Sequence, residues 1–110
     1  MKILTDEEFV ALMDDDESIG ALLITTDTCT KCKSIEPKLT AEHDGFVKYE
    51  LRRNSSEEAK SLISRLEVLA APATVLKHKR FTKTTPWTDM DKLLEFLRAP
   101  ETFAGDFRGE

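Results

Sequence analysis

The sequence predicts an α/β domain in which a central mixed β-sheet is flanked by helices, in the order β-α-β-α-β-α-β-β-α. Short apolar or alternating segments, typical of strands, take turns with amphipathic segments that begin on capping residues. This alternation indicates parallel strands joined by helices. The last two strand-like segments have no helix between them, which adds an antiparallel hairpin of edge strands. The 110 residues fit one domain, expected over residues 1–98, with a polar tail at 99–110.

The first half of the chain contains three expected strands and two expected helices. A short apolar start precedes TDEEFVALM (5–13), where Thr5 and Glu8 have capping-box spacing. GALLITT (20–26) is a continuous apolar run typical of a buried strand. Helical spacing then continues to Glu42, with Pro37 inside the helix. FVKYELRR (46–53) alternates as a strand does, with an apolar face and a polar face that carries Lys48, Glu50 and Arg52.

The second half begins with a helix that predicts a second capping box, from Ser55 to Glu58. ATVLKHKRFTKTT (73–85) is expected to form a hairpin, and DMDKLLEFL (89–97) a final amphipathic helix. The hairpin carries a basic cluster, KHKRFTK (77–83). Lysines at a sheet edge usually prevent edge-to-edge pairing, so we interpret the cluster as edge protection, with guidance of an acidic partner as the alternative.

Composition excludes several classes of function. Lys and Arg number 16 and Asp and Glu 21, for a net charge of −5, which argues against a general binder of nucleic acid or anionic membranes. The longest apolar run, ALLI (21–24), is too short to span a bilayer, and the N-terminal segment lacks the apolar core of a secretory signal. Two cysteines make no extracellular disulfide framework. We therefore expect a cytoplasmic, monomeric protein.

Both cysteines of the chain, Cys29 and Cys32, lie three positions apart at the predicted junction of a strand and a helix. Unpaired backbone amides at a helix N-terminus stabilise an anion, so the pKa of Cys29 should fall below the free value of about 8.5. Residues three apart on a helix have Cβ atoms roughly 5–6 Å apart, which allows a reversible disulfide. The predicted chemistry is thiol–disulfide exchange, with Cys29 as nucleophile and Cys32 as the shielded resolving thiol.

Three other interpretations of the cysteines are disfavoured. A buried pair without chemistry is disfavoured by the specific C-x-x-C arrangement at a β-to-α junction. A structural zinc site needs four ligands, and the only histidines, His43 and His78, lack the paired spacing of such sites. An iron–sulfur cluster shared across a dimer would need only two cysteines per chain, and it is disfavoured as zinc is. We therefore expect no metal and no bound cofactor.

The segment CTKCKSIEPKL (29–39) resembles the thioredoxin family, whose pattern after the cysteines is C-x-x-C-K-x-I-x-P-x-L. LTDEEF (4–9) resembles the family's opening segment, and APATVL (71–76) looks like its proline loop. The resemblance covers roughly residues 2 to 98 and implies the thioredoxin fold. It further implies a cis peptide bond between Ala71 and Pro72, beside the cysteines.

The resemblance also implies how substrate binds. An extended, disulfide-containing protein segment would lie against Thr28, Thr30 and Lys31 and hydrogen-bond to the backbone of Ala71, beside Pro72. The expected activity is that of a protein-disulfide reductase. A thioredoxin reductase with NADPH, or glutathione, would recharge it.

The chain departs from the family at several positions. Thr28 replaces a tryptophan, Thr30 and Lys31 replace the usual Gly-Pro, and Leu23 stands where the family carries a buried aspartate. Glu50 is the candidate to replace that aspartate as a proton relay. These departures leave two alternatives open: a glutaredoxin-like electron donor to ribonucleotide reductase, and a non-catalytic binding or adaptor module.

Overall fold

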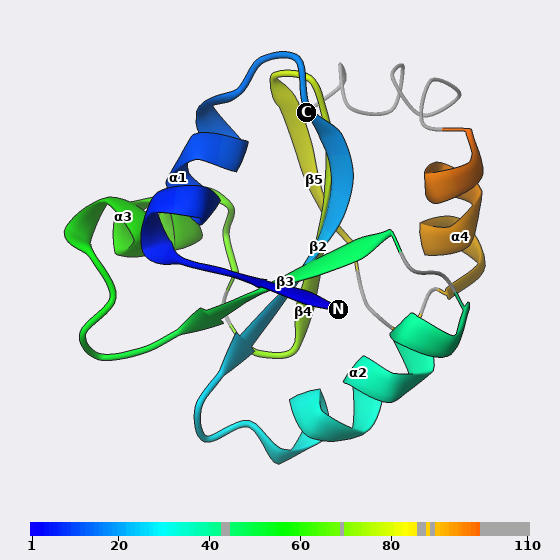
Figure 1. Cartoon of the computed structure of the whole chain (residues 1–110), viewed down its shortest axis with the longest axis horizontal. Coiled ribbons are helices and arrows are strands. Elements are labelled where there is room, and N and C mark those ends of the chain that lie inside the picture. The colour runs from blue at the N-terminus through cyan, green and yellow to red at the C-terminus, as the bar shows by residue number, and fades with distance from the viewer. Residues whose placement is uncertain (43–44, 69, 86–87, 89, 100–110) are drawn as a thin grey trace.

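The computed structural model describes residues 1–42, 45–68, 70–85, 88 and 90–99. The element order is the predicted one (Figure 1). The elements are β1 (Lys2–Leu4), α1 (Asp6–Asp14), β2 (Ile19–Thr26), α2 (Thr30–Glu42), β3 (Phe46–Leu51), α3 (Glu57–Arg65), β4 (Ala73–His78), β5 (Phe81–Thr85) and α4 (Met90–Arg98). The predicted tail beyond residue 99 lies outside the described residues.

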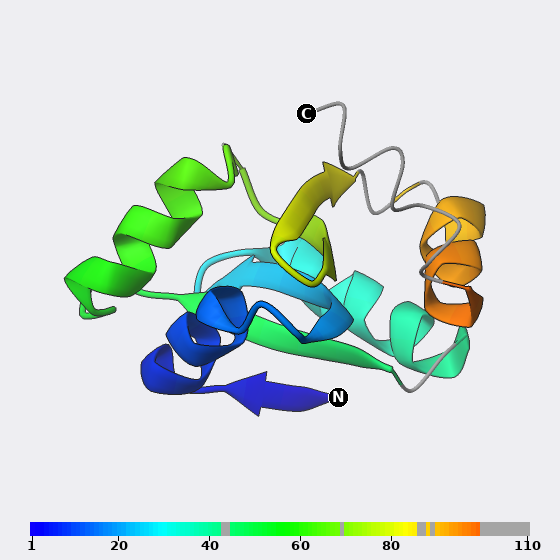
Figure 2. The same ribbon diagram turned by 90° about the horizontal axis from the view of Figure 1, so that it is seen from above.

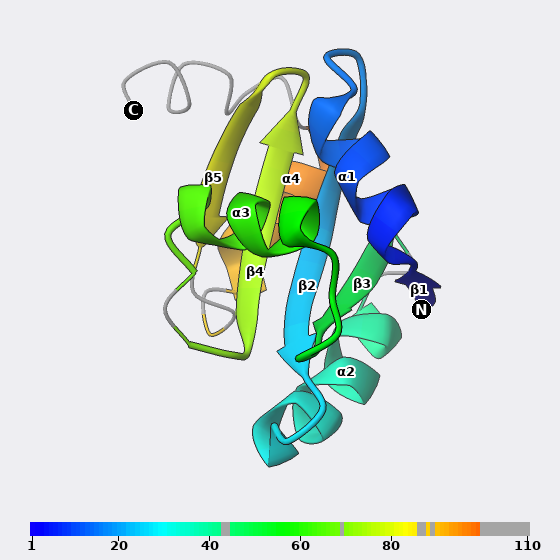
Figure 3. The same cartoon turned by 90° about the vertical axis from the view of Figure 1, so that its left-hand side faces the viewer.

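The five strands form one mixed sheet in the order β1-β3-β2-β4-β5 (Figure 3). β1, β3 and β2 are parallel, whereas β4 runs antiparallel to both β2 and β5. The expectation that both hairpin strands lie at an edge was therefore wrong for β4, which pairs on both sides. Because β1, β3 and β2 are parallel, their carboxyl ends lie at the same end of the sheet, where β2 leads into the cysteine segment.

Helices cover both faces of the sheet (Figures 1 and 2). α1 and α3 pack on one face and α2 and α4 on the other, as the two apolar clusters show. Alternate residues of β2 supply the two clusters, since strand side chains point to opposite faces. Leu22 and Ile24 face α1 and α3, whereas Ala21 and Leu23 face α2 and α4.

The helix starts confirm one predicted capping box and correct the other. At α1, Thr5 Oγ1 accepts from the Glu8 amide at 3.1 Å and the Thr5 amide donates to Glu8 Oε1 at 3.0 Å. At α3 the N-cap is Ser56, whose Oγ accepts from the Ala59 amide at 3.1 Å, so the assignment to Ser55 was wrong by one residue. The reason is tertiary: the buried Ser55 hydroxyl is engaged by β3 and its exit loop.

A hydrogen-bond network joins β3 to the starts of α1 and α3. The Tyr49 hydroxyl donates to Asp6 Oδ1 at 2.7 Å and lies 3.0 Å from Ser55 Oγ. The Ser56 amide donates to Asp6 Oδ2 at 2.8 Å. The bond from Tyr49, and then that from Ser56, lowers the pKa of Asp6. Residues distant in sequence are thereby fixed around one buried phenol.

We expect Tyr49 to titrate near pH 12. Burial, and more weakly the Asp6 carboxylate, raises the pKa of Tyr49 from 10.0 to about 12. Because the folded pKa lies above the unfolded one, Tyr49 stabilises the fold fully below pH 10 and progressively less as the pH rises toward 12. Tyr49 is the only tyrosine, so tyrosinate absorbance against pH reports it alone. Asp6→Asn should lower the midpoint, and equal midpoints for native and denatured protein would contradict the prediction.

The basic cluster is partly internal. Lys77 was expected at a sheet edge, but only 2% of it is exposed, and its Nζ donates to the backbone oxygens of Asp15, Ser18 and Lys79. Burial lowers the pKa of Lys77, and the nearby Asp15 and Asp16 carboxylates oppose that shift. Lys77 thus ties the acidic loop after α1 to the hairpin turn, which corrects the edge-protection interpretation for this residue.

Among the residues that the structure describes, no helix has the length and apolar character needed to cross a membrane.

Candidate active site

The two cysteines lie at the junction of β2 and α2, at one end of the sheet (Figure 3). β2 ends at Thr26 and α2 begins at Thr30, so Cys29 immediately precedes the helix and Cys32 lies in its first turn. They form a disulfide with a Cα–Cα distance of 5.4 Å. Only 3% of Cys32 is exposed, whereas Cys29 is half-buried. Cys29 is therefore the more exposed residue of the pair, and the roles of nucleophile and resolving thiol stay predictions.

The local electrostatics follow from the helix start. The Cys32 backbone amide donates to Cys29 Sγ at a distance of 3.2 Å. This amide belongs to the first turn of α2, where backbone N–H groups have no partner within the helix. The same amide would hydrogen-bond a thiolate at Cys29 after reduction, which favours the ionised form.

The predicted proline loop lies at the same end of the sheet. The Ala71–Pro72 peptide bond is cis, as the resemblance implied. β4 begins directly afterwards, and its first residue, Ala73, pairs with Ile24 near the end of β2. Ala71 and Pro72 are half-buried, so part of each reaches solvent. The pairing of β2 with β4 thereby brings the proline loop and the cysteine segment to the same end of the sheet.

The other residues predicted to contact substrate come from the cysteine segment itself. Thr28, Thr30 and Lys31 are all exposed around the disulfide. Their role in binding substrate stays a prediction.

Glu50 lies on the side of β3 that faces α2. Its register partner is Thr25 of β2, two residues beyond the buried Leu23. Arg52 holds the Glu50 carboxylate, with both Nε and a terminal nitrogen 2.6 Å from Oε2. The predicted proton-relay role of Glu50 is untested by this geometry, but its carboxylate already has a cationic partner.

Sequence reasoning missed an ion pair under α2. Lys48 Nζ donates to both carboxylate oxygens of Glu36 at 2.9 Å, and the two side chains are only 12% and 29% exposed. Alternation along β3 had placed Lys48 on a polar face. A sequence signal was present: Glu36 follows Cys32 by four residues, about one helical turn, so the two side chains lie on the same face of the predicted helix.

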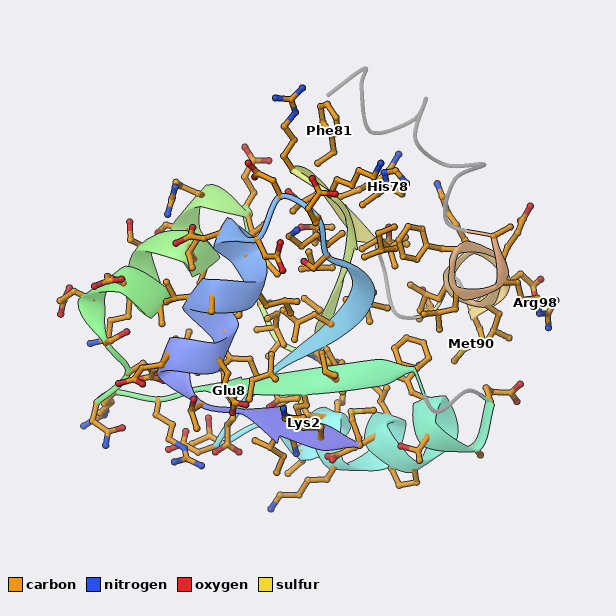
Figure 4. All side chains as sticks on the ribbon, turned by 45° about the horizontal axis from the view of Figure 1, so that its top comes forward. Lys2, Glu8, His78, Phe81, Met90 and Arg98 are labelled. Carbon is orange, nitrogen blue, oxygen red and sulfur yellow. A yellow bond between two sulfur atoms is a disulfide. The ribbon has the colours of Figure 1, made fainter. Side chains whose placement is uncertain are left out.

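No group of three or more potential metal-ligating side chains occurs within the described part of the chain. Of the two histidines, His43 lies outside the described residues, and His78 ends β4 beside Phe81 of the hairpin (Figure 4).

Comparison with solved structures identifies the fold. No protein-family model matches the sequence, and no curated protein matches it. Among solved structures, thioredoxin f2 of Chlamydomonas reinhardtii superimposes with a TM-score of 0.65 at 25% identity, over 91% of this chain and 97% of that one. The chain has the thioredoxin fold.

Other thioredoxin-fold structures agree. Thioredoxin f2 in a complex with ferredoxin:thioredoxin reductase matches with a TM-score of 0.68 at 18% identity, over 89% of this chain and 94% of that one. Oxidised thioredoxin O2 of Arabidopsis thaliana gives 0.62 at 17% identity, over 87% and 92%.

The disulfide at the active-site position fits a thioredoxin-family protein. The thioredoxin fold and the proximal cysteine pair together support thiol–disulfide oxidoreductase activity in general.

Proposed function

We propose that the protein is a thioredoxin-like reductase of protein disulfides. The single observation that carries this proposal is the Cys29–Cys32 disulfide at the start of α2, in which Cys29 is half-buried and Cys32 is buried. In the reduced protein, the Cys29 thiolate attacks a substrate disulfide and forms a mixed disulfide. The Cys32 sulfur then attacks Cys29 Sγ, and the substrate leaves reduced.

The position of the site at one end of the sheet indicates how substrate would bind. An extended segment would approach the exposed Thr28, Thr30 and Lys31 and the half-buried Ala71 and Pro72. Pro72 has no amide hydrogen, and the backbone of Ala71 would hydrogen-bond the segment as an added strand does.

For recharging, we propose a dedicated reductase and no bound cofactor, in a reducing compartment such as the cytoplasm. Support comes from the thioredoxin f2 relative, which is seen in complex with ferredoxin:thioredoxin reductase. Three donors should be compared on the oxidised protein: ferredoxin-linked reductase, thioredoxin reductase with NADPH, and glutathione. Preferential reduction by glutathione would favour the glutaredoxin-like alternative.

The proposal is tested by trapping. Cys32→Ser should accumulate mixed disulfides through Cys29, because the resolving sulfur is gone while the accessible nucleophile remains. We expect adducts with a model disulfide protein such as insulin that are visible on non-reducing gels and disappear with dithiothreitol. The matched Cys29→Ser variant should form none. Equal adduct formation by both variants would contradict the assigned roles.

A further inference from the structure

One buried hydroxyl near the disulfide has no hydrogen-bond partner. Thr25, in the last turn-ward part of β2, is only 2% exposed, and its Oγ1 bonds to no donor or acceptor among the described residues. Its register partner Glu50 directs its carboxylate to Arg52 instead. Most buried polar atoms in native proteins are paired, because an unpaired one is destabilising. The Thr25 hydroxyl therefore requires an explanation, and it lies four residues before Cys29.

The Thr25 side chain faces the same side of the sheet as α2. Ala21 and Leu23 pack in the apolar cluster to which α2 and α4 contribute. Leu22 and Ile24 pack in the cluster on the opposite face. Because strand side chains alternate between the two faces, Thr25 continues the row of Ala21 and Leu23 and is directed toward α2.

The arrangement of α2 on this face brings Thr25 next to Cys32. α2 follows β2 and turns back along the sheet (Figure 3), so its first buried residue lies over the last residue of the row on β2. The buried residues of α2 are Cys32, Ile35 and Leu39, and the latter two share the cluster of Leu23. Two residues of a strand span about 6.6 Å and three or four of a helix about 4.5–6 Å, so the two rows stay in step. Cys32 is consequently the α2 residue that lies over Thr25.

What Cys32 offers to this hydroxyl depends on the redox state. The structure shows the disulfide, whose sulfurs have no hydrogen to donate and are weak acceptors. A thiol has an S–H donor, and a thiolate accepts charge-assisted hydrogen bonds. The threonine hydroxyl can donate and accept, so it can pair with the reduced Cys32 sulfur in either protonation state.

We propose that the Thr25 hydroxyl hydrogen-bonds the Cys32 sulfur only in the reduced protein, and that this bond shifts the redox equilibrium toward the dithiol. The inference deepens the proposed function, on which it rests, by naming a residue that sets how strongly the protein reduces its substrates. In the exchange, Cys29 and Cys32 give two electrons and two protons to a substrate disulfide, whose S–S bond breaks to leave two thiols. The Cys29–Cys32 bond forms, and the Thr25 hydroxyl loses its partner. An apolar residue at this position would therefore make the protein a stronger reductant.

The first test is the redox equilibrium of Thr25→Val, which replaces the hydroxyl by a methyl group of similar size. Protein is equilibrated with mixtures of reduced and oxidised dithiothreitol, and free thiols are alkylated and counted by mass. The equilibrium constant for oxidation of the dithiol should rise about 3- to 10-fold, the usual net effect of losing one hydrogen bond. Thr25→Ser should remain near the parent value, since it keeps the hydroxyl.

Unfolding gives an independent readout, because the two redox forms should respond with different signs. In the oxidised protein, Thr25→Val removes an unpaired buried hydroxyl, so the midpoint of urea unfolding should stay equal or rise. In the reduced protein, the same substitution breaks a hydrogen bond, so the midpoint should fall. Loss of packing alone would lower both midpoints.

Thr85→Val is the matched control. Thr85 is also 2% exposed, and its Oγ1 also finds no partner in the part of the chain that the structure describes, but it lies on β5, which β4 separates from β2. The same substitution there should leave the redox equilibrium unchanged and move both midpoints in the same direction. Circular dichroism checks folding. If Thr25→Val does not fold, Thr25→Ala against Thr25→Ser decides, since both lack the methyl group and only Thr25→Ser keeps the hydroxyl.

An equilibrium constant that is unchanged or lower in Thr25→Val would overturn the proposal, as would equal shifts in Thr25→Val and Thr85→Val. Equal changes of the oxidised and reduced midpoints would also overturn it, because water or another group would then serve the hydroxyl in both forms. Neither measurement requires catalysis. Failure of the unaltered chain to reduce insulin would therefore count against the proposed function, whereas normal insulin reduction with an unshifted equilibrium would count against this inference alone.

Discussion

Cys29→Ser is expected to reduce the rate of insulin disulfide reduction to that of dithiothreitol alone. The hydroxyl of serine cannot form a mixed disulfide, and Cys32, 3% exposed, is too shielded to replace Cys29 as the attacking sulfur. The measurement is turbidity from precipitated insulin B chain, with dithiothreitol as the electron source. The loss should lie in activity and not in folding, because the half-buried Cys29 precedes α2 and is outside both apolar clusters.

Ser34→Ala is the matched control for this variant. Ser34 is exposed on α2 close to the disulfide in sequence, and we assign it no part in the chemistry. It should retain the rate of the unaltered protein. Substantial residual activity in Cys29→Ser would show that exchange proceeds through Cys32 or outside this site, and full biological activity in a variant lacking both cysteines would favour an adaptor function.

Phe9→Ala is expected to lower the free energy of unfolding by about 3–5 kcal/mol, the typical cost of emptying an aromatic site in a core. Phe9 of α1 is 0% exposed, and its ring stacks on Tyr49 at a centroid distance of 4.2 Å and an interplanar angle of 10°. The substitution therefore removes buried area and also a ring contact between α1 and β3. Urea unfolding of the oxidised protein, followed by circular dichroism, measures the change.

Ile3→Ala provides the comparison for Phe9→Ala. Ile3 also comes from the N-terminal segment, but 56% of it is exposed on the edge strand β1. Its truncation should alter stability by no more than ~0.5 kcal/mol. Similar losses for the two variants would contradict the assignment of Phe9 to the core, and with it the packing of α1 on β3.

The order of elements could be predicted because each signal is local. Capping residues, apolar periodicity and turn positions act within a few residues, so α1 and its Thr5–Glu8 capping box were identified directly. The same reasoning placed the α3 cap on Ser55 instead of Ser56. Both serines have the right chemistry, and only contacts with Tyr49 and the Arg52 amide decide between them.

Charged residues show the same limit more clearly. Alternation assigns Lys48 to a polar face, and the basic cluster assigns Lys77 to a sheet edge. Yet Lys77 is buried among backbone oxygens and Lys48 is paired beneath α2. A long side chain can bury its stem and still satisfy its ammonium group, provided that partners are available. Most of those partners are distant in sequence: they lie in the loop after α1 for Lys77 and in α2 for Lys48.

By itself, the sequence determined that Cys29 and Cys32 can form a disulfide, because the distance between two cysteines three residues apart at a strand-to-helix junction depends only on local geometry. It also determined the alternation of strands and helices. Only the tertiary structure decided that β4 lies inside the sheet and that Lys48 meets Glu36 beneath α2. Strand order and pairing between distant segments depend on how two faces of one sheet are covered, which no local pattern specifies.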